Sequence, residues 1–89
     1  MKLICDFWVL NIVDAIGSQE IRFGEIEKSL PISPATLTNR LKKLEEQGVV
    51  ARRVETLDKQ SVTYALTKKG QDLLPIIVAI RRFSELHAL

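Results

Sequence analysis

The chain is poor in the residues that carry covalent and metal chemistry. Its 89 residues include one cysteine, Cys5, and one histidine, His87. A lone cysteine cannot form an internal disulfide, so the sequence excludes a disulfide-stapled domain and favours a reducing cytoplasm. The two residues also fall short of a metal-ligand set, and no phosphate-binding glycine loop or nucleophile–base pair is evident. We therefore expect no metal, no cofactor and no enzyme.

Long apolar runs are also lacking. No stretch approaches the roughly 18–20 apolar residues that cross a bilayer. The N-terminal segment MKLICDFW carries Lys2 and Asp6 and has no small-residue cleavage site, so we expect neither a signal peptide nor a membrane partner. The hydrophobic fraction of 46% and the charged fraction of 27% are typical of a globular protein. We expect one domain, residues 1–89, in the cytoplasm and associated with the nucleoid.

The net charge of +2 is small, but its distribution is uneven. Residues 1–30 hold three basic and five acidic side chains, whereas residues 31–89 hold ten basic and six acidic ones. The excess of basic side chains in residues 31–89 suits a polyanion that docks on one side of the molecule. Random scatter over a solvated surface explains the same counts equally well.

Capping and turn signals predict a winged helix-turn-helix. Ser33 is a good N-cap, Pro34 suits the first helical position, and Gly48 suits a left-handed residue after a helix end. Thr67 caps the last helix, in which Pro75 predicts a bend or a late first turn. The expected helices are 3–16, 24–30, 33–47 and 67–89, and the expected extended segments are 20–23, 49–56 and 61–66. The fold class is α+β, mainly α, with a two- to three-stranded antiparallel wing sheet.

The helix over residues 33–47 has the layout of a DNA-recognition helix. Leu37, Leu41 and Leu44 fall within about 60° of one another and form a buried seam. The opposite side is small and polar at first and basic later, which suits base edges and phosphates in a major groove. An ordinary solvated helix face is the competing interpretation. The predicted DNA-contacting residues are Ser33, Ala35, Thr36, Thr38, Asn39, Arg40, Lys42 and Lys43.

The hairpin tip at about residues 57–61 is the predicted wing, with Lys59 and Gln60 against the DNA backbone or minor groove. Arg52 and Arg53 are neighbours on one strand, so their side chains point to opposite faces. We expect Arg53 to face DNA and the other arginine to lie over the core.

Both terminal helices, within residues 1–17 and 67–89, carry more apolar surface than one small core can use. Unpaired, this surface would be an aggregation hazard, so the pattern predicts a homodimer. Cys5 lies in the first of these helices, where it is either a buried hydrophobe or a redox-sensitive thiol. The predicted dimer residues are Leu3, Phe7, Leu10, Ile76, Ile77, Ile80 and Phe83.

The stretch RFGEIEKSLPISPATLTNRLKKLEEQGVVARR, followed by VTYALTKKGQDLLP, resembles the HxlR family of winged-helix transcription regulators. The second part is also similar to MarR-like and PadR-like regulators. The resemblance implies a homodimer built from the first and last helices. It also implies recognition by the helix that begins at Ser33, with Thr38 and Arg40 near the DNA and a wing around Lys59. The chain departs from the family at Ala35, where a basic residue is common, and lacks the proline typical of the wing.

The sequence thus predicts a prokaryotic transcription regulator that binds a pseudo-palindromic operator in double-stranded DNA as a homodimer. The alternative is a winged-helix protein–protein interaction module without DNA binding, because the fold serves both purposes.

Overall fold

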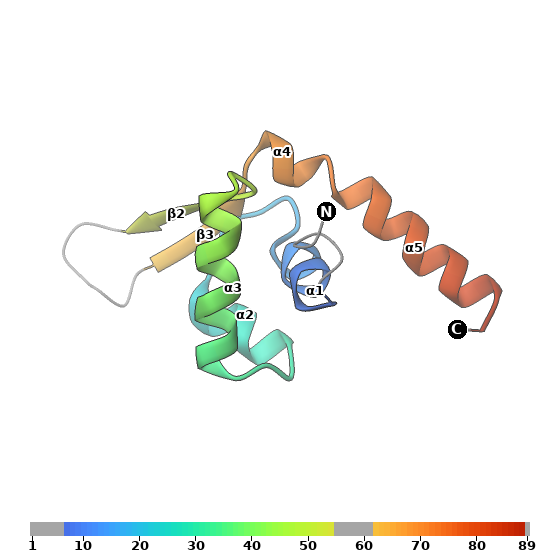
Figure 1. Ribbon diagram of the computed structural model, residues 1–89, viewed down its shortest axis with the longest axis horizontal. Coiled ribbons are helices and arrows are strands. Elements are labelled where there is room, and N and C mark those ends of the chain that lie inside the picture. The colour runs from blue at the N-terminus through green and yellow to red at the C-terminus, as the bar shows by residue number, and fades with distance from the viewer. Residues whose placement is uncertain (1–6, 55–61, 89) are drawn as a thin grey trace.

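The computed structural model describes residues 7–54 and 62–88, and for Phe7 it describes the backbone alone. The helices and strands follow in the order of a winged helix, which confirms the predicted fold class (Figure 1). They are α1 (Phe7–Ile16), β1 (Ile21–Arg22), α2 (Phe23–Ser29), α3 (Pro34–Glu46), β2 (Val50–Val54), β3 (Val62–Leu66), α4 (Lys68–Gln71) and α5 (Leu74–Leu86).

The three strands form one antiparallel sheet in the order β1-β3-β2. Tyr64 on β3 pairs with Arg52 on one side and with Ile21 on the other. Tyr64 and Leu66 are buried, so one face of the sheet packs on the helices. The hairpin of β2 and β3 is the predicted one, and the short β1 completes the sheet at its other edge.

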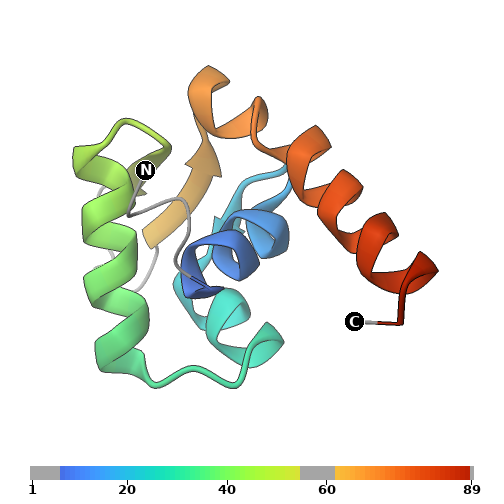
Figure 2. The ribbon, with the colours of Figure 1, turned by 45° about the vertical axis from the view of Figure 1, so that its right-hand side comes forward.

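A single core joins the helices to the sheet. In Figure 2, α1 lies at the centre, with α2 below it and α3 and the sheet to its side. The buried residues of α1 lie on the side that these elements cover, and the leucine seam of α3 is buried as predicted. The core residues are Val9, Ile12, Val13, Ile16, Ile26, Ile32, Leu37, Leu41, Leu44, Val49, Val50, Tyr64, Leu66 and Ile77.

Both ends of α3 are closed by hydrogen bonds that the sequence signals predicted. At the start, the Ser33 side-chain oxygen accepts a hydrogen bond from the backbone N–H of Thr36 at 3.2 Å. At the end, Gly48 has φ +73°, and its N–H donates to the carbonyl of Glu45 at 3.0 Å. The N–H of Val49 donates to the carbonyl of Leu44 at 2.9 Å, which completes a Schellman motif. Helix α3 is therefore well terminated within one chain.

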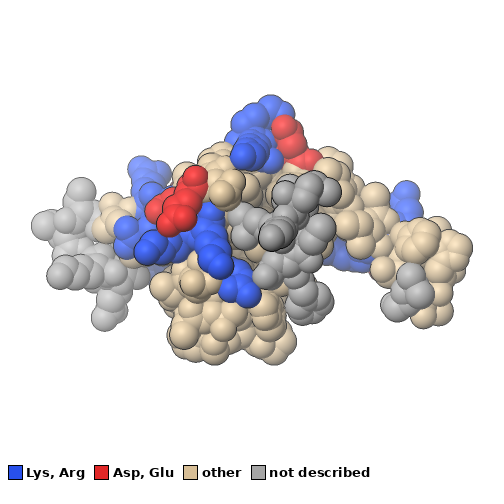
Figure 3. Space-filling view, in the orientation of Figure 1, with Lys and Arg blue, Asp and Glu red and all other residues tan. Residues whose placement is uncertain are grey.

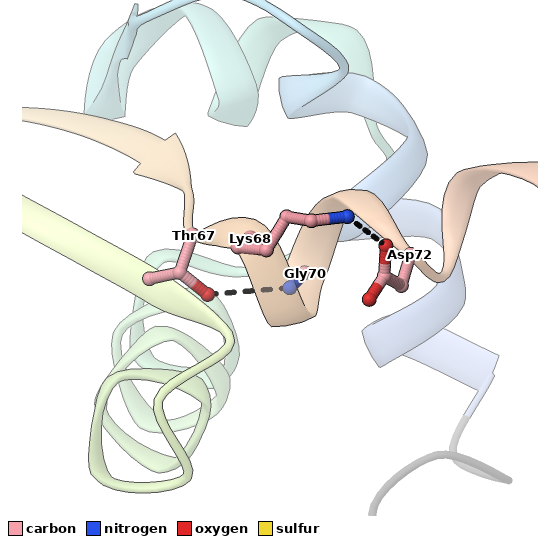
Figure 4. A network of polar contacts seen from close by, with 4 residues as sticks. All are labelled: Thr67, Lys68, Gly70 and Asp72. Atoms are coloured by element: carbon pink, nitrogen blue, oxygen red, sulfur yellow. Dashed lines mark hydrogen bonds and ion pairs between the residues drawn. The ribbon is translucent and has the colours of Figure 1, made fainter.

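The segment that follows α3 is fastened to the start of α4 through Thr67 and Gly70, in a set of contacts that we name the Thr67 clasp. Figure 4 shows the hydrogen bond between Thr67 and Gly70. The Thr67 hydroxyl donates to the carbonyl of Gly48, and it accepts from the N–H of Gly70 at 3.2 Å. A Cβ atom at Gly70 would lie 2.2 Å from the carbonyl oxygen of Val49. Only glycine allows this close approach of the two backbones.

A salt bridge across α4 lies beside the clasp. The Lys68 ammonium donates to the Asp72 carboxylate at 2.8 Å (Figure 4). This hydrogen bond, followed by the charge of the carboxylate, raises the pKa of Lys68 above its ordinary value. Both side chains are well exposed, so the pair contributes little to the stability of the fold.

The predicted single helix over residues 67–89 is wrong, because the chain forms two helices there. Helix α4 ends at Gln71, and Pro75 stands in the first turn of α5, where its missing N–H costs no helical hydrogen bond. The expected disturbance at Pro75 is thus the start of a new helix. Helix α5 projects away from the body of the molecule (Figures 1 and 2). It is joined to α1 by the buried Ile77 and by an ion pair between Arg81 and Asp14.

Candidate nucleic-acid interface

The face of α3 opposite its leucine seam is open to solvent. The predicted contact residues at its centre, Ala35, Asn39 and Lys42, are exposed, and so are Ser33, Thr38 and Lys43. Thr36 and Arg40 lie on the flank and are half-buried. The structure therefore brings all eight predicted residues of this helix to one surface or its edge.

Some of these polar side chains already hold one another. The Ser33 hydroxyl donates to the Thr36 hydroxyl at 2.9 Å, in addition to its capping contact with the Thr36 N–H. The Arg40 guanidinium donates to the Asn39 side-chain oxygen at 2.8 Å. These contacts orient polar side chains at the start and the middle of the exposed face before any ligand binds. They therefore reduce the conformational entropy that these side chains lose on binding.

Charge changes along α3 from one end to the other. Its first six residues, 34–39, carry no charge, and Figure 3 shows this uncharged surface at the lower end of the helix. Lys and Arg gather over the later part of α3 and the neighbouring sheet, and acidic groups lie near the top of this region. Such a surface can bring a neutral helix end close to base edges while the flanking cations meet phosphates.

The two arginines of β2 point to opposite faces of the sheet, as predicted. Arg53 pairs with Thr63 in register, and its guanidinium lies 3.7 Å from the carboxylate of Glu20, which also accepts from the Thr63 hydroxyl. Arg52 instead lies beside α3, next to Thr38 and Lys42. The prediction that Arg53 faces DNA stays a prediction. Lys59 and Gln60, at the predicted wing tip, lie outside the described residues.

Helix α5 presents an apolar surface that no other described part of the chain covers. Five of its hydrophobic side chains are about half exposed or more: Ile76 53%, Val78 50%, Ile80 48%, Phe83 55% and Leu86 75%. This set contains three of the predicted dimer residues, Ile76, Ile80 and Phe83. Soluble monomers rarely leave such a row of large apolar side chains in water.

The other predicted dimer residues divide into two groups. Ile77 is 7% exposed and belongs to the core, and Leu10 is half-buried against that core, so both are largely used within one chain. Leu3 and Cys5 lie outside the described residues, and of Phe7 only the backbone is described. A helical wheel drawn from sequence cannot separate Ile77 from Ile76 and Ile80, because the packing against α1 decides which side of α5 is buried.

The described residues contain neither a membrane-spanning helix nor a metal-ligand cluster. No helix within residues 7–54 and 62–88 is long and apolar enough to span a bilayer. The same part of the chain holds no group of three or more His, Cys, Asp or Glu residues that could bind a metal ion.

A solvent-facing polar helix, preceded by a short helix and followed by a β-hairpin, defines a winged helix-turn-helix protein. The HxlR-like helix-turn-helix family matches residues 3–88, which is nearly the whole sequence. The chain therefore belongs to this family of transcriptional regulators, as its motifs suggested.

Individual relatives agree with the family. The HTH-type transcriptional regulator YvaP of Bacillus subtilis is 41% identical over 78 residues, which are 86% of this chain and 72% of YvaP. Other curated HTH-type regulators are longer, and the chain spans 62% of two of them and 54% of another.

Solved structures share the fold over nearly the whole chain. A MarR-family transcriptional regulator from Porphyromonas gingivalis is 32% identical with a TM-score of 0.89, over 96% of this chain and 84% of that one. The redox regulator HypR in its reduced form is 28% identical with a TM-score of 0.90, over 98% of this chain and 87% of that one.

Proposed function

We propose that the chain acts as a homodimeric, sequence-specific DNA-binding regulator that places one copy of α3 in each half of a pseudo-palindromic operator. The observation that carries this proposal is the exposed face of α3, which is neutral at its start and basic toward its middle. The family supports the same role, because the curated relatives are named HTH-type transcriptional regulators.

In this proposal, the N-terminal half of α3 faces the base edges. Thr38 and Asn39 are exposed there and can donate and accept hydrogen bonds, whereas Ala35 offers only a methyl group, which suits a thymine methyl. Lys42 and Lys43 follow one turn later, where their long side chains reach phosphates. Residues 57–61, with Lys59 and Gln60, contact the backbone or the minor groove beside the helix.

The dimer is the second part of the proposal, and it rests on α5. A second copy of the chain would cover Ile76, Ile80 and Phe83, and a two-fold axis would set the same apolar surface of each copy against the other. The predicted contributions of Leu3 and Phe7 from the N-terminal region remain part of this proposal. A regulator of this kind works at the nucleoid in the cytoplasm and catalyses no reaction.

Selection of genomic fragments by the purified protein tests the function. We expect fragments that share an inverted repeat, with half-site centres separated by one turn of DNA or a multiple of it, each turn being about 34 Å. Affinity should fall steeply as the salt concentration rises, because bound phosphates release counterions.

A pair of lysine variants makes the test specific to α3. Lys43→Ala should weaken binding by about five- to tenfold, because it removes a phosphate contact. Lys68→Ala, on α4 and away from the exposed face of α3, should bind as the unmodified protein does. If no fragment is enriched at low salt and high protein concentration, the protein is instead an interaction module.

A further inference from the structure

A notch of about 330 Å³ lies between α3 and β2, on the side of the sheet that faces the helices. We name it the α3–β2 notch. It brings together side chains from α3 and from two neighbouring strands. Its lining residues are Thr38, Leu41, Lys42, Glu45, Arg52 and Tyr64.

The floor of the α3–β2 notch consists of core residues. Leu41 is 1% exposed and Tyr64 is 8% exposed, so both belong to the core. Arg52 is the cross-strand neighbour of Tyr64, and its Cβ therefore points to the same face of the sheet. The backbone of Arg52 is held by the β2–β3 ladder, whereas its side chain is exposed.

Arg52 and Lys42, the two cations of the α3–β2 notch, lack the ion-pair partner that the neighbouring Arg53 has among the described residues. The guanidinium of Arg53 has Glu20 as a partner at 3.7 Å. Within the described ranges, by contrast, no ion pair engages Arg52 or Lys42. Arg52, Lys42 and Thr38 thus line one small concave site, and each carries a side-chain donor that suits an oxyanion.

We propose that the α3–β2 notch is a binding site for one phosphodiester group of the DNA backbone, with Arg52 as its principal ligand. The inference rests on the proposed function, because the phosphate arrives only when α3 lies in the major groove. The Arg52 guanidinium presents a planar pair of donors that matches two phosphate oxygens, and Lys42 adds a second positive charge. Thr38 adds a hydroxyl donor from the helix.

Glu45 works against the bound phosphate. Its carboxylate is the one acidic group among the residues that line the α3–β2 notch, and it repels an anion at close range. The site therefore binds phosphate below its potential strength, which leaves more of the binding energy to the base contacts of α3. Removal of the Glu45 charge should therefore raise the affinity for DNA, which can be tested.

The test compares Arg52→Gln with Arg53→Gln, two adjacent arginines on one strand. Arg52→Gln should lower affinity for the selected operator by about three- to tenfold, lower affinity for unrelated DNA by the same factor, and reduce the salt slope by about one. Arg53→Gln should leave the slope unchanged, because that guanidinium lies on the other face beside Glu20. Arg52→Lys should restore the slope but only part of the affinity, since ammonium lacks the paired donors.

Glu45→Gln should change the affinity for DNA in the opposite direction. It should tighten binding to all DNA by a few-fold, an outcome that a merely structural role of the notch would not give. Equal slopes for Arg52→Gln and Arg53→Gln, or no gain from Glu45→Gln, would overturn the inference. Lys43→Ala separates the two proposals: if it weakens binding while Arg52→Gln does not, α3 binds DNA and the α3–β2 notch does not hold a phosphate.

Discussion

Helices α3 and α5 have the same length and begin in the same way, but they expose side chains of different chemistry. Each has 13 residues and a proline in its first turn. Helix α3 buries Leu37, Leu41 and Leu44 and exposes polar and basic side chains. Helix α5 buries Ile77 alone and exposes a row of large apolar side chains.

The difference shows what each helix still requires. The apolar side of α3 is satisfied within one chain, so its exposed face is free to be polar and to bind a hydrated, charged ligand. The apolar side of α5 is not satisfied, and water is a poor partner for it. One chain therefore offers two surfaces of opposite chemistry: a basic one that suits DNA, and an apolar one that a second copy would cover in the proposed homodimer.

The largest expected effect comes from placing charge on the apolar row of α5. Combining Ile80→Glu with Phe83→Glu should weaken the dimer by about 4 kcal/mol, or roughly a thousandfold, because each side chain would carry an unpaired charge into the interface. Sedimentation at micromolar concentration measures this. Asn39→Glu places a carboxylate on the exposed face of α3 and should leave the oligomeric state unchanged. If the double variant is still fully dimeric, α5 does not form the dimer interface.

The seam of α3 should give the next largest effect. Leu41→Ala should lower the free energy of unfolding by about 3 kcal/mol, because the side chain is fully packed and its removal leaves a cavity. Urea denaturation followed by circular dichroism measures it. Val78→Ala on α5, studied in the monomeric double variant, should cost less than about 1 kcal/mol, since that side chain is half exposed. Equal losses would contradict the contrast between the two helices.

The Thr67 clasp, which joins the segment after α3 to the start of α4, should be next. Gly70→Ala should destabilise the protein by about 2 kcal/mol, because the new methyl group meets the Val49 carbonyl. Gly24→Ala is the matched control: nothing lies within 4 Å of a Cβ there, so the helical preference of alanine should be neutral or mildly stabilising. Thermal melting of both variants decides the matter, and an unaffected Gly70→Ala protein would refute the close approach.

The smallest effect should come from the N-cap of α3. Ser33→Ala should cost about 1 kcal/mol, because the Thr36 N–H loses its acceptor. Ser29→Ala on α2 should cost less, because the Ser29 hydroxyl only donates to a carbonyl four residues earlier. Denaturant titration of the two variants compares them, and a larger loss in Ser29→Ala would show that the cap contributes little.

Local signals predicted α3 well because its ends and seam depend on nearby residues. Ser33 caps, Gly48 adopts a positive φ, and the leucines at helical spacing are buried. The family resemblance, carried by the same stretch, was confirmed by the match over residues 3–88.

Properties that depend on distant parts of the chain were not predictable. Alternation along β2 shows that Arg52 and Arg53 face apart, but the pairing with Tyr64 on β3 determines which one faces α3. In the same way, the contact with α1 determines that Ile77 is buried while Ile76 is not. The Thr67 clasp depends likewise on Gly48 and Val49, which lie about twenty residues earlier in the sequence.

The Thr67 clasp also has a geometrical consequence. It holds Gly48 and Val49, which directly follow α3, against Thr67 at the start of α4, and α5 begins only three residues after α4 ends. In a dimer joined through α5, these few residues would form the arm that sets how far apart the two copies of α3 stand. The spacing of operator half-sites would then be determined by the hydrogen bonds of Thr67 and the missing side chain of Gly70, far from any base that the protein contacts.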